Sequence, residues 1–296
     1  MHTYLPSIGF SGINSWTDEE RLLKWIVDSP DQVKMAQTGS GNRSLAVYEK
    51  HFSEDGRIGI RVFGTFENGH FSVISYLPYA ENPKVNLTMP CELTRAGDGE
   101  RLIGSVDDFR LGLLLIFTVS NYGRILLAEN QQNKTPEVKG IRLTGLGKDG
   151  RIIMPVKMTE AQKRIHQRAL KKRDDLSKRV RAGDQDAVNE FCQDDVSLSS
   201  DARLRLLSGE TDVYSVVNTT ILPVGVECDQ YQVVALILSV ETIRNDYTKE
   251  ELYYFRVRIN TVEAVICIPK SEVYGVPEAG RRLKCKIWLI GEAVTE

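Results

Sequence analysis

Residues 163–181 carry the strongest concentration of charge in the chain, with nine cations and two anions. On one helix, such a set could form an electrostatic surface for a phosphate backbone. Residues 184–201 follow directly and hold six anions and no cation. Because a second helix folded back on the first would offset its charge, we favour a solvated charged face over a nucleic-acid site. The candidate interaction residues on the basic stretch are Lys171, Lys172 and Arg173.

A thiol lies between two carboxylates in the string formed by Glu227, Cys228 and Asp229. A nucleophilic thiolate needs a base or a cation beside it, whereas adjacent acids disfavour the charged thiolate. A metal site would also need a nearby histidine and ligand spacing that this string lacks. We therefore interpret it as a polar loop that enters a strand.

The four histidines, His2, His51, His70 and His166, are dispersed along the chain. His51 and His70 fall on expected strands and could be neighbours across a sheet. No serine or cysteine motif accompanies them, so a nucleophile–base pair is unsupported. The glycine-rich string TGSG near Gly39 is not followed by the Gly-Lys-Ser/Thr of a phosphate loop. The sequence thus predicts no catalytic, cofactor-binding or metal-binding residue.

The composition is that of an ordinary globular protein, with 296 residues, 42% hydrophobic residues and a formal net charge of -2. This near balance argues against a surface devoted to a polyanion. The longest apolar run, 111–119, falls short of the roughly 18 residues that span a bilayer, and the start of the chain lacks a signal-peptide pattern. The five cysteines show no CxxC spacing. We expect a cytoplasmic protein with reduced, mostly buried thiols.

The elements of residues 1–158 indicate an α+β domain. Ser15 or Thr17 can cap a first helix, with Glu20 placed for a capping box on Thr17. Three strands of an antiparallel meander follow, with one wet face on the middle strand; they are expected at 44–52, 57–66 and 71–77.

Two further stretches of this domain carry weaker patterns. Residues 107–119 fit either a helix capped by Asp107 or a central strand, because the string LLLIF suits both. Residues 138–146 and 151–156 are expected to form a hairpin that turns at the string KDG. The first domain is therefore expected to hold a mixed or antiparallel sheet.

Residues 159–208 are expected to form a helical connector, an αα-hairpin. The first helix can run to Arg181, with Gly183 as its C-terminal cap, and Asp184 can cap the second helix.

Residues 209–296 are expected to form a small β-barrel, which resembles an OB-fold by analogy only. Its five candidate strands are 213–222, 231–243, 252–260, 262–269 and 282–290. This region holds thirteen acids and nine bases, and its charge argues against an oligonucleotide groove. Trp288 and Ile290 would lie on the outer face of the last strand. Large apolar groups there should be covered by another element or a partner, so both are candidate interaction residues.

Several strings resemble an uncharacterised family of Gram-positive, clostridial bacteria that is catalogued as a domain of unknown function, number 3881 in its series. They are YLPSIGFSGI, LTGLGKDGRIIMPVK, DVYSVVNTTILPVGVECDQY and GVPEAGRRLKCKIWLIG, which together span nearly the whole chain. The resemblance implies a soluble bacterial protein of one recurring architecture. It implies no catalytic or binding residue.

Our leading hypothesis is a non-enzymatic cytoplasmic binding or scaffold protein. The alternative is an enzyme whose site lies between the domains and is assembled from distant residues. A second alternative is a nucleic-acid-associated factor that uses the basic helix 163–181. We expect no cofactor, no nucleic acid and no membrane, and a protein partner or self-association stays open.

Overall fold

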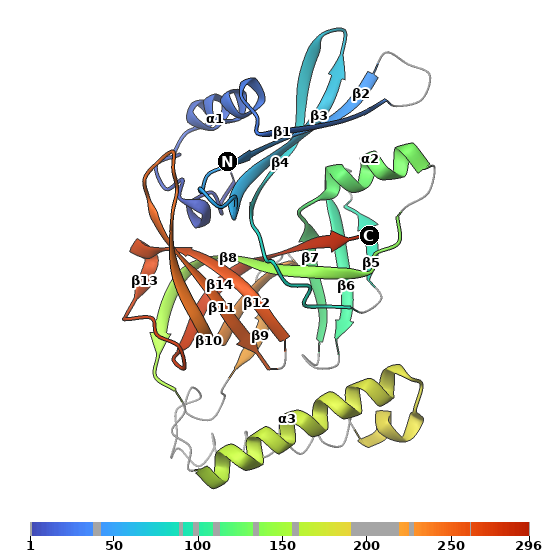
Figure 1. The fold of residues 1–296 in the computed structure, drawn as a ribbon, viewed down its shortest axis with the longest axis vertical. Helices are drawn as coiled ribbons and strands as arrows, with labels where there is room; N and C mark the ends of the chain where they lie inside the picture. Colours follow the sequence, from blue (N-terminus) through green and yellow to red (C-terminus); the bar gives the residue numbers. More distant parts are fainter. Residues whose placement is uncertain are drawn as a thin grey trace.

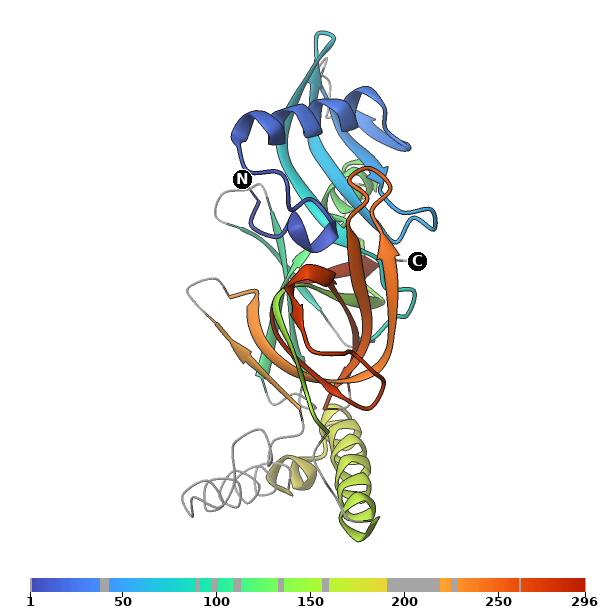
Figure 2. The same ribbon diagram turned by 90° about the vertical axis from the view of Figure 1, so that its left-hand side faces the viewer.

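A computed structural model of the chain describes residues 2–37, 43–88, 91–96, 101–108, 113–132, 136–155, 160–190, 219–224, 228–260 and 262–295. The molecule has three parts along its long axis (Figures 1 and 2). A four-stranded sheet with a helix lies at one end, a β-barrel with a sheet extension in the middle, and a long helix at the other end. This arrangement confirms the α+β fold class.

Helix α1 (Trp16–Asp28) begins within the stretch that the sequence predicts. The Ser15 hydroxyl accepts a hydrogen bond from the Asp18 N–H and donates one to the Asp18 carboxylate. Ser15 is therefore the N-cap, and Asp18 takes the place that we expected for Glu20. A short 3-10 turn, η1 (Pro6–Ile8), precedes α1.

The N-terminal sheet has four antiparallel strands in chain order. They are β1 (Gln32–Gln37), β2 (Arg43–His51), β3 (Ile58–Glu67) and β4 (His70–Ala80). The predicted meander corresponds to the last three, and β1 adds an edge strand that the sequence did not indicate. Asn68 and Gly69, both at positive φ, make the two-residue turn between β3 and β4.

The wet face that we expected on β3 is wrong. Arg61 lies on that face and is only 4% exposed. It is covered because Glu292 reaches it from the barrel, and the ring of Tyr122 packs on Phe63 farther along the strand. The sheet is therefore buried on both faces along most of β3.

Five strands close into the predicted barrel, and four of them are among the expected strands. They are β8 (Gly140–Ile153), β10 (Gln230–Arg244), β11 (Glu251–Ile259), β12 (Val262–Pro269) and β14 (Arg282–Val294). Around the barrel the order is β8, β12, β11, β10 and β14, and β14 pairs again with β8. The β8–β12 pair is parallel and the others are antiparallel. One barrel strand, β8, thus comes from the region that precedes the helical connector.

The hairpin expected at the string KDG is wrong. Residues 140–153 form the single strand β8, which pairs with β14 from Gly140 to Ile153. Asp149 takes a positive φ of 57°, and the register shifts opposite it between Lys284 and Lys286. The turn-forming residues therefore make an irregularity within a continuous strand instead of reversing the chain.

A sheet extension leaves the barrel beside β14. It consists of β7 (Leu113–Val119), β6 (Leu102–Asp108) and β5 (Glu92–Arg95). The ambiguous stretch 107–119 is thus strand wherever it is described. The Tyr231 hydroxyl donates to the Ile116 carbonyl and accepts from the Ile116 N–H, at 3.0 and 2.9 Å. This side chain satisfies the backbone of β7 where it parts from the barrel.

Smaller elements complete the middle part. Helix α2 (Tyr122–Gln132) follows β7 and packs against β1 and β2. The edge strands are β9 (Thr220–Pro223) on β10 and β13 (Val273–Tyr274) on β8, and a 3-10 turn, η2 (Lys270–Glu272), precedes β13. The portion of the expected strand 213–222 before residue 219 lies outside the described residues.

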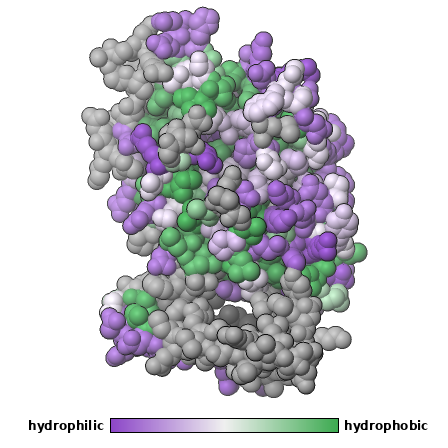
Figure 3. All heavy atoms as spheres, turned by 180° about the vertical axis from the view of Figure 1, so that it is seen from behind, coloured by the Kyte–Doolittle hydropathy of each residue, from purple (hydrophilic) through white to green (hydrophobic). Residues whose placement is uncertain are grey.

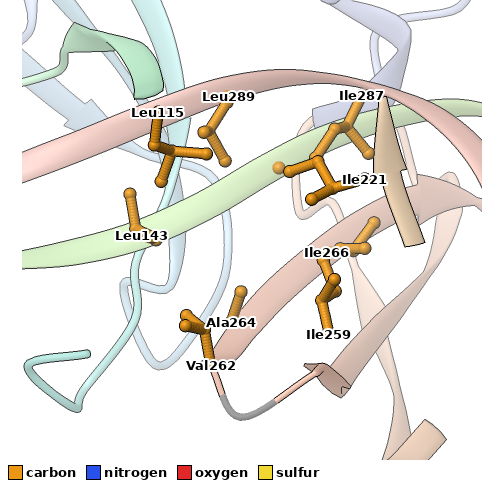
Figure 4. A pocket seen from close by; sticks show the side chains of 10 residues that line it. Leu115, Leu143, Ile221, Ile259, Val262, Ala264, Ile266, Ile287 and Leu289 are labelled. Atoms are coloured by element: carbon orange, nitrogen blue, oxygen red, sulfur yellow. The ribbon is translucent and has the colours of Figure 1, made fainter. Parts of the chain in front are cut away.

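The barrel interior is filled with apolar side chains (Figure 4). The cavity that remains is about 20 Å³ and is lined by residues such as Leu115, Ile266, Ile287 and Leu289. A space of this size holds about one water molecule, and an apolar one of this kind stays dry. The barrel is therefore a packed core and not a ligand channel.

A second apolar cluster joins the barrel to the N-terminal layer. Trp288 and Ile290 are buried in it, as predicted, and Trp288 stacks on Tyr4 with ring centroids 5.7 Å apart. The Trp288 Nε1–H donates to Asp229 at 2.7 Å. The cover is thus the protein's own N-terminal segment.

Helix α3 (Glu160–Arg181) and the short helix 185–190 form the described part of the connector. Gly183 at φ 84° ends α3, and the Asp184 carboxylate accepts from the Ala187 N–H at 3.1 Å. Leu176, Val180 and Ala187 pack between the two helices. Both predicted caps are confirmed.

None of the helices in the described part of the chain is both long enough and apolar enough to span a membrane. The described thiols are free: Cys267 and Cys285 are buried, Cys91 is half-buried and Cys228 is exposed. Cys192 lies outside the described residues. The expectation of mostly buried thiols therefore fails at Cys228.

Candidate functional site

A cleft of about 570 Å³ lies where β1, α2, β8 and the end of β14 meet. Its charged lining residues are Lys34, Arg124, Arg142 and Glu292. Apolar side chains of β1 and α2 line another part of the wall; among them are Met35, Ile125, Leu127 and Ala128. The volume lies in the range of about 300–1,000 Å³ that is usual for small-molecule sites.

Glu49 on β2 lies beside the cleft and binds two arginine side chains. It is buried and accepts from Arg61 Nε at 3.2 Å and from Arg124 Nη2. Burial would raise the pKa of the Glu49 carboxyl, but Arg61 and Arg124 outweigh burial and hold the pKa at about 2. Glu49 is therefore ionised at neutral pH and holds two guanidinium groups in place.

Arg61 is the second buried charge. Its guanidinium lies over the Tyr79 ring at 3.9 Å and within 3.7 Å of Glu81. Burial would lower the pKa of Arg61, yet the charge of Glu49 and its neighbours raises it above the ordinary value. The Tyr79 hydroxyl is hydrogen-bonded to His51 Nδ1 at 2.9 Å, and burial is the main cause that raises the pKa of Tyr79.

A small polar cavity of about 10 Å³ adjoins the cleft and shares Arg142 and Glu292 with it. Glu81 lines this cavity, and burial raises its pKa, opposed by Arg61 and reinforced by Glu292. Two carboxylates, Glu81 and Glu292, thus face one guanidinium, Arg61, at 3.7 and 4.0 Å. The cavity is about the size of one water molecule.

The described side chains that line the cleft and the small cavity are better suited to ligand binding than to catalysis. It supplies cations, carboxylates, an amide from Asn121 and apolar walls. Neither the cleft nor the small cavity has a histidine or cysteine among its described lining residues. Across the described chain, no group of three His, Cys, Asp or Glu residues is placed to hold a metal ion.

One known family is similar to the chain over nearly its whole length. A family model described as "Domain of unknown function, E. rectale Gene description (DUF3881)" matches residues 5–291. The chain belongs to this family. No curated protein and no solved structure matches it. The DUF3881 assignment confirms the resemblance that the sequence strings indicated, and it assigns no activity.

The basic residues that we singled out in this DUF3881 chain lie on α3 and not at the cleft. Lys172 contacts Glu190 at 3.0 Å, and Arg179 contacts Asp184 at 2.7 Å. Lys171 is exposed, and the side chain of Arg173 lies outside the described part. Part of the basic charge is therefore paired with acidic residues that follow in the sequence.

The structure also places two other groups of residues discussed above, the histidines expected on strands and the string 227–229. His51 and His70 are not neighbours, because His70 pairs with Glu67 at the β3–β4 turn and His51 with Gly59 at the other end of the sheet. Asp229 is buried, where it accepts hydrogen bonds from Thr118 Oγ1 and Trp288 Nε1, both at 2.7 Å. Glu227 lies outside the described residues.

Among the described residues, exposed apolar side chains are distributed over several elements. Leu114 and Leu222 are more than half exposed, and hydrophobic residues on the face seen from behind form separate patches among hydrophilic ones (Figure 3). Such scattered groups are usual on protein surfaces.

Sequence reasoning missed the residues of the cleft and the buried Glu49–Arg61 pair beside it. Glu49, Arg61, Arg124, Arg142 and Glu292 are spread over most of the chain. The available signal was Arg61, a charge within a run that is apolar at Ile60 and Val62, and we read it as the wet face of a strand.

Proposed function

We propose that this protein is a non-catalytic binding protein of the cytoplasm, and that the cleft beside α2 is its ligand site. The observation that carries the proposal is a ligand-sized cleft of about 570 Å³ whose guanidinium groups are held by carboxylates. Its described lining offers no histidine or cysteine for covalent or acid–base chemistry.

Preorganisation supports this proposal. Arg124 is held by Glu49 and by the Gln32 side chain at 3.3 Å, and Arg142 by Glu292 at 3.3 Å. A side chain that is fixed before binding loses less conformational entropy when the ligand arrives. The buried or partly buried carboxylates therefore position the cations without needing the ligand.

The cytoplasmic location is part of the proposal. Cys267 and Cys285 are buried and free. Chains that mature in oxidising compartments more often pair their cysteines.

An enzyme is the second candidate, and the pair of Glu81 and Glu292 is the observation that favours it. A carboxyl whose pKa is raised beside a second carboxylate can act as an acid or base. The cavity that Glu81 lines measures only about 10 Å³, so a substrate would have to reach the carboxyl from the larger cleft. Binding is therefore the simpler use of this geometry.

The test is recovery of small molecules from a bacterial metabolite extract by the purified full chain. We expect a compound to be enriched and released unchanged on denaturation, as measured by mass spectrometry. Ala128→Trp, which fills the cleft, should abolish enrichment, whereas Ala182→Trp at an exposed turn should not. Conversion of the compound would favour the enzyme, and equal enrichment by the Ala128→Trp variant would overturn the site.

A further inference from the structure

We propose that the ligand of the cleft is a small organic anion. Its carboxylate or phosphate group contacts Lys34, Arg124 and Arg142, and its apolar part lies against α2. This inference rests on the proposed function, because it names the class of ligand for the same site.

Arg142 offers a partly exposed guanidinium to such a group. Its Nη1 contacts the Glu292 carboxylate at 3.3 Å. Its Nε is buried, and no acceptor in the described part of the chain contacts it. A guanidinium binds carboxylate or phosphate through charge-assisted hydrogen bonds. The Nε atom has no open surface, so a ligand anion would contact the exposed part of this side chain, which is 36% exposed.

Arg124 adds a second partly exposed guanidinium from α2. Its Nη2 is taken by Glu49, while its Nε is also buried without an acceptor among the described residues. Lys34 on β1 is exposed and forms no ion pair within the described chain. Three cations therefore line the cleft against one carboxylate, that of Glu292, which already contacts Arg142 and Arg61.

The apolar wall of the cleft favours an organic anion over an inorganic one. Met35 is about half exposed at 47%, and Ile125, Leu127 and Ala128 line the wall on α2. Each buried methylene of a ligand gains about 0.8 kcal/mol on transfer from water. A ligand with a short apolar chain beside its anionic group would use both parts of the cleft.

Calorimetric titration of the full chain at low salt tests the inference with defined probes. The probes are hexanoate, hexyl phosphate, hexylamine, hexanol, acetate and inorganic phosphate. We expect hexanoate or hexyl phosphate to bind at least about tenfold more tightly than the neutral, cationic and inorganic probes, and the stronger of the two identifies the head group. Equal binding of hexanol, or no binding by either organic anion, would overturn the inference.

Variants connect the affinity to the named residues. Arg142→Gln and Lys34→Gln should each weaken binding of the preferred anion, by about tenfold for the arginine. The matched control is Arg244→Gln, which changes an exposed arginine at the β10–β11 pairing that does not line the cleft. Unchanged affinity in Arg142→Gln would overturn the assignment.

The two proposals can fail separately. If no organic anion binds while the extract experiment still yields a compound that Ala128→Trp excludes, the ligand class is wrong and the binding function stands. If neither experiment yields a ligand, both proposals fall.

Discussion

Glu49 is the residue whose charge matters most for the fold around the cleft. It is 2% exposed and lies between two guanidinium groups. A buried ion pair adds little stability compared with apolar residues, but removal of one partner leaves the remaining buried charge poorly compensated. Glu49 is therefore difficult to replace, whatever the ligand is.

The first prediction is that Glu49→Gln lowers the free energy of unfolding by about 3–5 kcal/mol, because Arg61 and Arg124 lose their common anion. Urea denaturation monitored by fluorescence measures this change. Glu54→Gln, at an exposed turn, is the control and should change stability by less than about 0.5 kcal/mol.

The pH dependence of this effect has a definite sign. The pKa of Glu49 is lowered from 4.5 to about 2 in the folded protein. Its stabilising contribution is therefore complete above pH 4.5 and is lost as the pH falls towards about 2. The difference between the wild-type chain and Glu49→Gln should narrow over this interval. A difference that stays constant down to pH 2 would contradict the lowered pKa.

Trp288 gives the second prediction at this scale. Its Nε1–H is one of two described donors to the buried Asp229 carboxylate, and Phe cannot supply it. We expect Trp288→Phe to destabilise the chain by about 1–3 kcal/mol, measured by urea denaturation. Trp16→Phe, at a site that is 68% exposed, is the matched control and should be nearly neutral. Equal effects of the two substitutions would show that the hydrogen bond to Asp229 is unimportant.

At the level of elements, sequence patterns predicted those that carry strong local signals. The caps Ser15, Gly183 and Asp184 and the β3–β4 turn were found because short-range hydrogen bonds and positive φ values determine them. The barrel strands β10, β11, β12 and β14 were found from runs of alternating or continuous apolar residues.

Helix α2 was missed for a physical reason. Asn121 at its start exchanges two hydrogen bonds with the backbone of Ala293, far along the chain, at 2.8 and 3.0 Å. Its first turn also carries no acidic residue. Tertiary contacts therefore hold the beginning of α2, and a local pattern does not reveal them.

The cleft and the buried Glu49–Arg61 pair beside it could not be predicted because long-range sheet pairings bring several of their residues together. Arg142 and Glu292 are opposite each other in the β8–β14 pair, and Glu49 is opposite Arg61 in the β2–β3 pair. The register that joins them depends on long-range pairing, which spacing in one sequence does not encode.

Helix α3 provides the third prediction. Lys172, Lys178 and Arg179 each contact an acidic residue of the connector. We therefore expect no measurable affinity for duplex DNA or single-stranded RNA near physiological salt. Fluorescence anisotropy with labelled oligonucleotides from about 50 to about 200 mM salt measures this. Micromolar binding that weakens steeply with salt, and is lost when Lys171, Lys172 and Arg173 are changed to Glu, would contradict it.

At the scale of the whole molecule, the reactivity of two buried thiols measures whether the barrel stays closed. Burial raises the pKa of Cys267 to about 12 and also raises that of Cys285. The fourth prediction is that both react with a thiol reagent only as fast as the protein unfolds, whereas the exposed Cys228 reacts at once. Peptide mass spectrometry after timed labelling separates the three sites. Rapid labelling of Cys285 in the native chain would contradict a closed barrel.

The position of β14 also has a consequence for how the chain is made. This strand pairs with β7, β8 and β10, yet the ribosome synthesises it after all of them. During translation β8 emerges before α3 and must wait for β12 and β14, with its backbone groups unpaired. The barrel seam and the cleft wall that carries Glu292 can form only when the last strand has been released. Chains that stop before Arg282 should therefore be recognised by chaperones and proteases as unfinished.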